Sequence, residues 1–195
     1  MQILSSARSR RGLVCGKIAP GTRKPLAVLA VLITLPAHAT IPTAPAADEY
    51  RVRFFHTHTG ERLDIVYRQG DHYLPEALAK LNYYLRDHRT GEVHEYDPKV
   101  FDLLHDLMAA AGRPGGEIDV ICGYRTPWSN EFLRSRSNGV ARNSLHLQAM
   151  AIDIRVPGIA TARLRDAALA LHRGGVGYYA KSDFVHVDVG RVRRW

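Results

Sequence analysis

The chain has 195 residues, with 27 basic and 19 acidic side chains and a formal net charge of +8. Six of the basic residues and none of the acidic ones lie in the first 39 positions, which leaves 21 basic and 19 acidic side chains, a net charge of +2. The high isoelectric point is therefore mostly a property of the N-terminal segment, and the remaining charge gives no reason to expect nucleic-acid binding.

The first 39 residues have the layout of a secretory signal peptide. Basic residues precede an apolar run from Pro25 to Pro36, and Ala37-His38-Ala39 resembles a cleavage site between small residues. The run has about 12 residues, fewer than the ~20 that a membrane-spanning helix needs. We therefore expect export, with no stable membrane insertion once the leader is removed. Ser9-Arg10-Arg11 leaves both the general secretory and the twin-arginine routes open.

The rest of the chain predicts a short linker and one domain. Residues 40–49 are rich in Pro and Ala, which is typical of a linker, and residues 50–195 have the length of one ordinary domain. Cys15 lies in the leader, so Cys122 is the domain's single thiol and no internal disulfide can form. Cys122 ends an apolar run, which predicts a buried thiol on a strand.

Hydrophobic periodicity predicts a domain of mixed helices and strands. Expected strands cover 50–55, 62–68, 118–122, 150–156, 176–179 and 184–189, and expected helices start at Pro75, Asp97-Pro98, Thr126-Pro127 and Ala160. We expect Gly112 to end the second helix and Gly174-Gly175 the fourth. The basic tail 191–195 is expected to be a solvated end. The pattern favours an α+β fold, a small antiparallel sheet with helices packed on one side.

Two histidines and an aspartate are candidates for a metal site. Asp153 lies within an apolar strand pattern, where a carboxylate is costly unless it is paired with a cation or bound to a metal. His146 precedes that strand by a loop. His186 and Asp188 are two residues apart and so share one face of a later strand, while the valines beside them face the core. Two histidines and one aspartate would leave the fourth position of a tetrahedral zinc open for water. Alternatively, Asp153 pairs with a buried arginine and Asp188 forms a turn.

Three segments carry a family resemblance that covers about residues 50–195. Ser144-x-His146-x-x-Ala149-x-Ala151-x-Asp153 resembles the Ser-x-His-x-x-Gly-x-Ala-x-Asp signature of the D-Ala-D-Ala carboxypeptidase, lysostaphin and hedgehog-like zinc peptidase group. Gly123-Tyr124-Arg125-Thr126 looks like an upstream segment of the same group. Residues 184–195 are similar to the C-terminal end of the murein endopeptidase K family, small exported proteins of Gram-negative bacteria.

The resemblance implies a hedgehog/D-Ala-D-Ala peptidase-like fold and a role for each motif residue. His146, Asp153 and His186 would hold one zinc ion per chain. Arg125 would bind a substrate carboxylate or carbonyl with its planar fork of donors. Ser144 would be a hydrogen-bonding neighbour of the site.

The general base is the point where this chain departs from the family pattern. Many relatives have Glu-x-x-His, with the glutamate three residues before the last zinc ligand, whereas this chain has Asp183 there. Asp is one methylene shorter, so Asp188, on the same strand face as His186, is the alternative base. Ala149 also replaces the usual glycine of the signature.

The resemblance implies a periplasmic, zinc-dependent murein endopeptidase that acts on peptidoglycan. It would cut stem-peptide cross-links, either between D-Ala and diaminopimelate or between two diaminopimelates. Two alternatives stay open: a D-Ala-D-Ala-type carboxypeptidase, and a zinc-containing peptidoglycan-binding module without turnover. The sequence does not indicate an oligomeric state.

Overall fold

The computed structural model describes residues 16, 21, 48–137 and 139–195. The expected signal peptide 1–39, apart from two isolated glycines, and residues 40–47 of the expected linker lie outside the described residues. The first strand begins at Glu49, the last residue of the expected linker.

The described part of the chain contains eight strands, four α-helices and two 3-10 helices. In chain order they are β1 (Glu49–His56), β2 (Arg62–Gln69), β3 (His72–Tyr73), α1 (Pro75–Tyr84), α2 (Lys99–Ala110), β4 (Glu117–Cys122), α3 (Pro127–Arg134), η1 (Leu145–Gln148), β5 (Ala151–Arg155), α4 (Thr161–Leu171), β6 (Gly175–Tyr179), η2 (Ala180–Ser182), β7 (Phe184–Asp188) and β8 (Arg193–Arg194).

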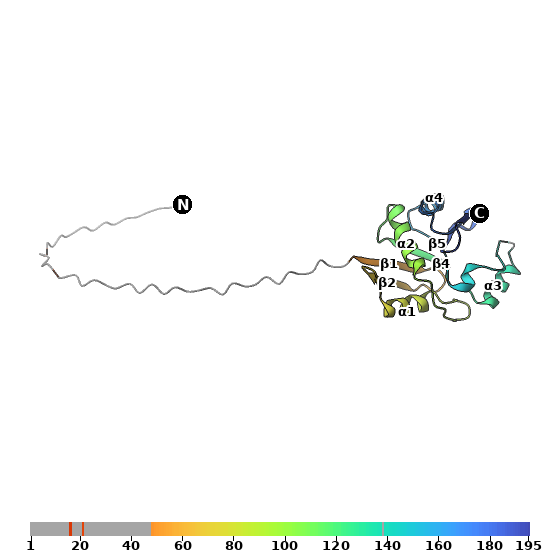
Figure 1. The fold of residues 1–195 in the computed structure, drawn as a ribbon, viewed down its shortest axis with the longest axis horizontal. Helices are drawn as coiled ribbons and strands as arrows, with labels where there is room; N and C mark the ends of the chain where they lie inside the picture. Colours follow the sequence, from red (N-terminus) through yellow and green to blue (C-terminus); the bar gives the residue numbers. More distant parts are fainter. Residues whose placement is uncertain (1–15, 17–20, 22–47, 138) are drawn as a thin grey trace, which may run out of the picture. The chain divides into compact units, whose positions relative to one another are not determined.

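All eight strands join one sheet, in the order β3-β2-β1-β4-β5-β7-β6-β8 (Figure 1). β1 pairs with β4 in parallel, because α1 and α2 carry the chain back between them, and β6 pairs with β8 in parallel. The predicted α+β class is confirmed. The sheet is larger than predicted, because two of its strands have only two residues and leave no alternating pattern in the sequence. It is also mixed in direction, since two of its strand pairs are parallel.

The first two predicted strands, β1 and β2, form an antiparallel hairpin, which shows how side-chain alternation divides the sheet into two faces. Val52 and Phe54 are buried, whereas Arg51 and Arg53 between them are exposed. Gly60, with φ of +73°, allows the turn that leads from β1 into β2. The apolar face of the hairpin packs against α1 and α2.

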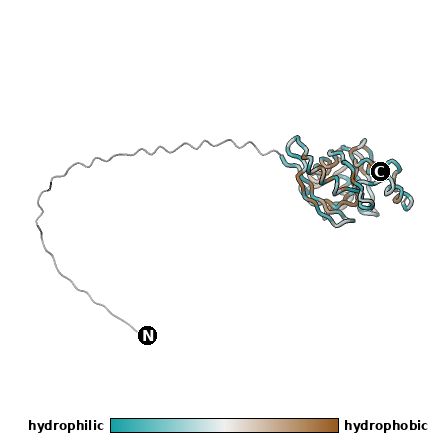
Figure 2. The backbone as a smooth tube through the Cα atoms, turned by 90° about the horizontal axis from the view of Figure 1, so that it is seen from below, coloured by the Kyte–Doolittle hydropathy of each residue, from teal (hydrophilic) through white to brown (hydrophobic). Residues whose placement is uncertain are grey.

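Three helices cover one face of the sheet and form a single hydrophobic core with it. α1, α2 and α4 contribute buried residues to the cluster that includes Phe54, Ile118, Ile154 and Val187 from the strands. In Figure 2 the hydrophobic stretches of the backbone lie largely inside the folded part. α3 adds no residue to this cluster. The opposite face of β5 and β7 is therefore left free for polar side chains.

The predicted helix starts are confirmed to within one residue, and one predicted helix end is wrong. α2 begins at Lys99, whose N–H donates to the Asp97 carboxylate at 3.0 Å. α4 ends at Leu171, and the residue that caps it is His172, in the left-handed conformation with φ of 51°. The glycines that follow do not form the cap. A Cβ on Gly174 would collide with the backbone carbonyl of Asp188, so this glycine serves the close approach of the chain to β7.

The tail is largely exposed, as predicted for a solvated end, but it is also paired with the sheet. Arg193 and Arg194 form β8 beside β6, and the Tyr178 N–H donates to the carbonyl of Trp195 at 3.0 Å. Backbone pairing holds this segment, and its polar side chains gave no apolar pattern from which to predict it. No helix among the described residues is long and apolar enough to cross a membrane.

Candidate metal centre

The three predicted ligands come from neighbouring elements on the face of the sheet opposite the helices. Asp153 lies on β5 and pairs directly with His186 on β7. His146 lies on η1, whose first turn is capped by the Ser144 hydroxyl, which accepts from the His146 N–H at 3.3 Å. Ala149 then turns the chain into β5 with φ of 49°, at the position where the family pattern has glycine.

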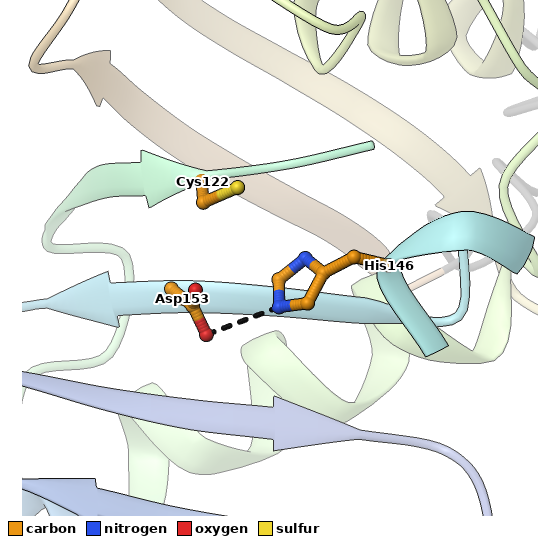
Figure 3. Close-up of side chains that lie close together, drawn as sticks. All are labelled: Cys122, His146 and Asp153. Carbon is orange, nitrogen blue, oxygen red and sulfur yellow. Dashed lines mark hydrogen bonds and ion pairs between the residues drawn. The ribbon is translucent and has the colours of Figure 1, made fainter. Parts of the chain in front are cut away.

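The ligand atoms of these residues form a small triangle. His146 Nε2 lies 3.1 Å from Asp153 Oδ1 and 3.1 Å from His186 Nδ1, and His186 Nδ1 lies 2.9 Å from Asp153 Oδ1. Figure 3 shows the side chains of Asp153 and His146 pointing toward one another. All three residues are buried.

In each imidazole, the hydrogen bond made by the ring nitrogen outside the triangle shows where the proton is. The nitrogen inside the triangle then presents a lone pair. His146 Nδ1 lies 2.7 Å from the carbonyl oxygen of Gly123, an acceptor, so this nitrogen carries the proton. His186 Nε2 lies 2.9 Å from the Asp188 carboxylate and carries the proton of that ring. In the neutral rings, two nitrogen lone pairs therefore meet one carboxylate oxygen, and all three atoms are acceptors.

Three converging acceptors fit a zinc ion. Zinc bonds of about 2.0–2.1 Å in tetrahedral geometry put ligand atoms roughly 3.3 Å apart, close to the 2.9–3.1 Å seen here. The set of two histidines and one carboxylate is typical of catalytic zinc, which keeps a position open. The residues present therefore suit this ion.

The pKa shifts of the three groups reflect their burial and their mutual contacts. Burial lowers the pKa of His146, and the charge of Asp153 only partly opposes this effect. Burial by itself would raise the pKa of Asp153, but the charge of His146 and hydrogen bonds with both imidazoles bring it below its usual value. For His186, burial is outweighed by the carboxylates of Asp153 and Asp188, which favour the protonated ring and raise the pKa.

Cys122 lies beside the triangle without completing it. It can offer its sulfur within 4.8 Å of ligand atoms of His146 and Asp153, and Figure 3 shows it at the end of β4 with no interaction marked to either. Its Sγ lies 3.7 Å from the carbonyl oxygen of Gly123, and burial raises its pKa to about 12. His186 Nδ1, at 3.1 Å from His146 Nε2 and 2.9 Å from Asp153 Oδ1, is the third atom of the triangle. The prediction of a buried strand thiol is confirmed.

Asp188 lies next to His186, but every contact of its carboxylate is a donor. Oδ2 accepts from His186 Nε2 at 2.9 Å and Arg193 Nη2 at 2.7 Å. Oδ1 accepts from the N–H groups of Gly175 and Gly190 and from Arg193 Nη1, at 2.9–3.0 Å. Burial raises its pKa, but these hydrogen bonds more than offset it and leave the pKa well below the usual value. The carboxylate therefore fixes the orientation of His186.

The structure does not bring Asp183 to the metal triangle. Asp183 adopts the left-handed conformation, with φ of 51°, just before β7 begins. Its carboxylate accepts from Thr161 Oγ1 at 3.0 Å and lies 3.6 Å from the guanidinium of Arg155. Its side chain is 61% exposed, and Asp183 is not among the described residues that line the cavity beside Asp153 and His186.

Arg125 and Ser144 lie together beside the metal triangle. Arg125 Nη2 donates to the Ser144 hydroxyl at 3.0 Å, and the Arg125 N–H donates to the carbonyl of His146 at 3.1 Å. The guanidinium is buried, yet its Nε has no hydrogen-bond partner. Its buried Nε is therefore a donor without a partner among the described residues.

A cavity of about 740 Å³ lies beside the triangle, lined by Asp153 and His186 of its three residues, and by residues from both ends of the domain. Its walls include Arg89, His58 and His88, three residues that were not predicted as part of the site. The rings of His58 and His88 stack at 4.2 Å, and burial together with the charge of Arg89 lowers the pKa of both. The sequence shows closely spaced histidines at residues 56–58 and another at 88, which could have indicated part of a site. No local sequence pattern connects them with the metal motif.

Comparison with known proteins agrees with this site. The family model described as peptidoglycan L,D-endopeptidase MepK matches residues 44–195. The chain is 38% identical over 194 residues to the peptidoglycan L,D-endopeptidase MepK of Escherichia coli K12, covering 97% of each chain. It is 42% identical over 142 residues to the probable peptidoglycan L,D-endopeptidase MepK of Haemophilus influenzae, which is 73% of this chain and 76% of the relative. No solved structure matches the chain.

The match to the family model covers well over half of the chain, and the relatives are similar over most of their length. The resemblance stated from the sequence is confirmed. The chain belongs to the peptidoglycan L,D-endopeptidase MepK family of metallopeptidases.

Proposed function

We propose that this protein is a zinc-dependent, periplasmic peptidoglycan L,D-endopeptidase that hydrolyses cross-links between two diaminopimelate residues. The relatives are described as L,D-endopeptidases. A bond between two diaminopimelates joins the carbonyl of an L-centre to the amine of a D-centre. A bond between D-Ala and diaminopimelate joins two D-centres instead. Of the two cross-links expected from the sequence, the bond between two diaminopimelates therefore agrees with the description of the relatives.

The observation that carries the proposal is the convergence of three acceptor atoms, two of them from residues that line a cavity. His146, Asp153 and His186 would hold the zinc, because their proton-bearing nitrogens and their carboxylate contacts leave the lone pairs facing one another. When bound, zinc supplies a Lewis acid for the scissile carbonyl and lowers the pKa of water.

The remaining residues would bind and orient the reacting groups. Arg125, fixed by Ser144, would bind a carboxylate or the carbonyl oxygen with its free donor. Asp188 would hold His186 in the tautomer that binds metal, since all its lone-pair directions already meet donors. We assign Asp183 no part in the chemistry, because its carboxylate is bound to Thr161 on α4.

Digestion of purified peptidoglycan tests the proposal. The zinc-loaded protein should convert dimers joined through two diaminopimelates into monomers, and removal of the metal should stop the reaction. His146→Ala should lose both zinc and cleavage, whereas His72→Ala, at an exposed position on β3, should retain both. Loss of terminal D-Ala with intact dimers would instead establish a carboxypeptidase. Zinc at one equivalent without any product would establish a binding module.

Periplasmic location rests on the leader pattern and on the substrate, which lies outside the cytoplasmic membrane. Fractionation of cells that express the full chain should give a shortened protein in the periplasm. A full-length protein in the cytoplasm would contradict this part of the proposal.

A further inference from the structure

Two arginines of the cavity have buried donors without partners. Arg125 Nε and Arg89 Nη1 are buried, and neither makes a hydrogen bond in the described structure. None of the ion pairs formed among residues 48–137 and 139–195 includes either guanidinium. A buried charged donor without a partner is costly, so a site that keeps two of them is suited to an anionic ligand.

One buried carboxylate holds the two arginines near each other. Asp87 Oδ1 accepts from the backbone N–H of Arg89 at 3.0 Å. Its Oδ2 accepts from the N–H and the hydroxyl of Thr126, the residue after Arg125, both at 2.8 Å. Asp87 is fully buried. The segments that carry Arg89 and Arg125 are thus joined at one carboxylate, and both side chains line the same cavity.

The charge balance of the cavity favours an anion. Asp153 is the one carboxylate residue among its described lining residues, against three arginines. Asp153 is engaged with two imidazoles, and the third arginine, Arg193, is bound to Asp188. Among the described residues neither the Arg89 nor the Arg125 guanidinium is ion-paired with a carboxylate, and Asp87 contacts Arg89 through the backbone N–H. Both arginines lie close enough to the Cys122 thiol to lower its pKa, against the larger, opposing effect of burial.

We propose that Arg89 is a specificity-determining residue that binds, together with Arg125, the free carboxylate next to the scissile bond of the cross-link. This inference rests on the proposed function. In a bond between two diaminopimelates, the scissile nitrogen is attached to a D-centre carbon that also carries a free carboxylate. Guanidinium groups match carboxylates in geometry and charge. A substrate amidated at that carboxylate offers neither the charge nor four equivalent acceptor positions.

Two matched substrates test the role of Arg89. One is the purified dimer joined through two diaminopimelates, and the other is the same dimer with the carboxylate beside the scissile nitrogen converted to the amide. The wild-type protein should prefer the carboxylate form by roughly 10- to 100-fold in kcat/KM, the range of a charge-assisted hydrogen bond. Arg89→Gln should lose most of that preference through a higher KM, with little change on the amidated dimer.

Two further variants separate charge, geometry and folding. Arg89→Lys should keep part of the preference, because lysine retains the charge but lacks the fork. Arg53→Gln, which removes an exposed arginine paired with Asp64 on β1 and β2, should behave as the wild type. Zinc content and melting temperature are measured for each variant. A preference that is absent in the wild type, or an equal loss on both dimers in Arg89→Gln, would overturn the role of Arg89.

Binding to the metal-depleted protein separates this inference from the proposed function. Calorimetry should show tighter binding of the carboxylate dimer than of the amidated dimer, and Arg89→Gln should abolish the difference. If the zinc-loaded wild type cuts neither dimer, the proposed function fails, and the binding preference still decides the carboxylate site. Equal binding of both dimers would refute the site even if the enzyme is active.

Discussion

Replacement of Asp188 by Asn separates a role in orienting His186 from a role as general base. The carboxylate accepts from His186 Nε2 on one oxygen and from two glycine N–H groups on the other, with Arg193 bound to both. An amide would keep its oxygen on the glycine side, where the N–H donors gather. Its NH₂ group would then face His186 Nε2. The imidazole would favour the tautomer with Nδ1 protonated, and the zinc-facing lone pair would be lost.

The structure allows an estimate of the size of this effect. Loss of a residue that orients a metal-binding histidine typically weakens metal affinity 10- to 100-fold, or about 1.4–2.7 kcal/mol. The fold should also lose about 1–3 kcal/mol, because the buried carboxylate no longer meets Arg193 as an ion. The Arg193 side chain is 30% exposed, which keeps this loss well below that of a fully buried pair.

Zinc affinity measured by competition with a chelator is the decisive assay, and kcat at saturating zinc is measured beside it. We expect Asp188→Asn to have a weaker zinc Kd and to recover much of its activity when zinc is in excess. Asp183→Asn, at the exposed side chain beside Thr161, should match the wild type in both measurements. Unchanged zinc affinity in Asp188→Asn with kcat lost at every zinc concentration would refute the orienting role and favour a general base.

Three other substitutions test the packing around the site. Gly177→Ala would place a Cβ 2.6 Å from the indole of Trp195. We expect the free energy of unfolding, measured by thermal unfolding, to fall by about 1–3 kcal/mol and KM to rise. Unchanged values would show that the indole moves freely. In Gly123→Ala the added Cβ would lie 2.6 Å from the carbonyl oxygen of Leu85. The variant should bind zinc more weakly, since the Gly123 carbonyl orients His146. A wild-type zinc Kd would contradict this. Burial and a neighbouring imidazole lower the pKa of His56 from 6.5 to about 4. As the pH is lowered, His56 of the unfolded state therefore takes up its proton before His56 of the folded state. The free energy of unfolding should fall by at most about 3 kcal/mol between pH 6.5 and pH 4. His56→Phe should flatten that segment of the stability curve, and an unchanged slope would exclude His56 as its source.

The elements that carry the three candidate metal ligands could be predicted because their signals are local. Alternation along residues 184–188 placed His186 and Asp188 on one face and the valines in the core, and the structure agrees. The apolar residues around Asp153 likewise predicted a buried strand with one costly carboxylate. The spatial approach of the three ligand atoms was inferred from the family resemblance, and the sheet order provides it by pairing β5 with β7.

The contacts that surround the ligands could not be predicted, because they join segments far apart in the chain. Arg89 lies at the cavity because Asp87 binds its backbone N–H and also binds Thr126, which lies 39 residues after Asp87 in the chain. Arg193 reaches Asp188 because backbone pairing places the tail beside β6, where side-chain periodicity carries no information. The sequence likewise does not indicate that Asp183 precedes β7 in a left-handed conformation or that its carboxylate contacts Thr161 on α4.

The architecture explains why the site needs its glycines as much as its charged residues. His186 is held by Asp188, and Asp188 is held in turn by the N–H groups of Gly175 and Gly190. A Cβ on Gly175 would enter the space of the Asp188 carboxylate and of Arg193. The donors can approach the carboxylate only because the backbone there carries no side chain. The lone pair that faces the metal position thus depends on glycines of β6 and of the turn after β7, which contribute no atom to the metal triangle itself.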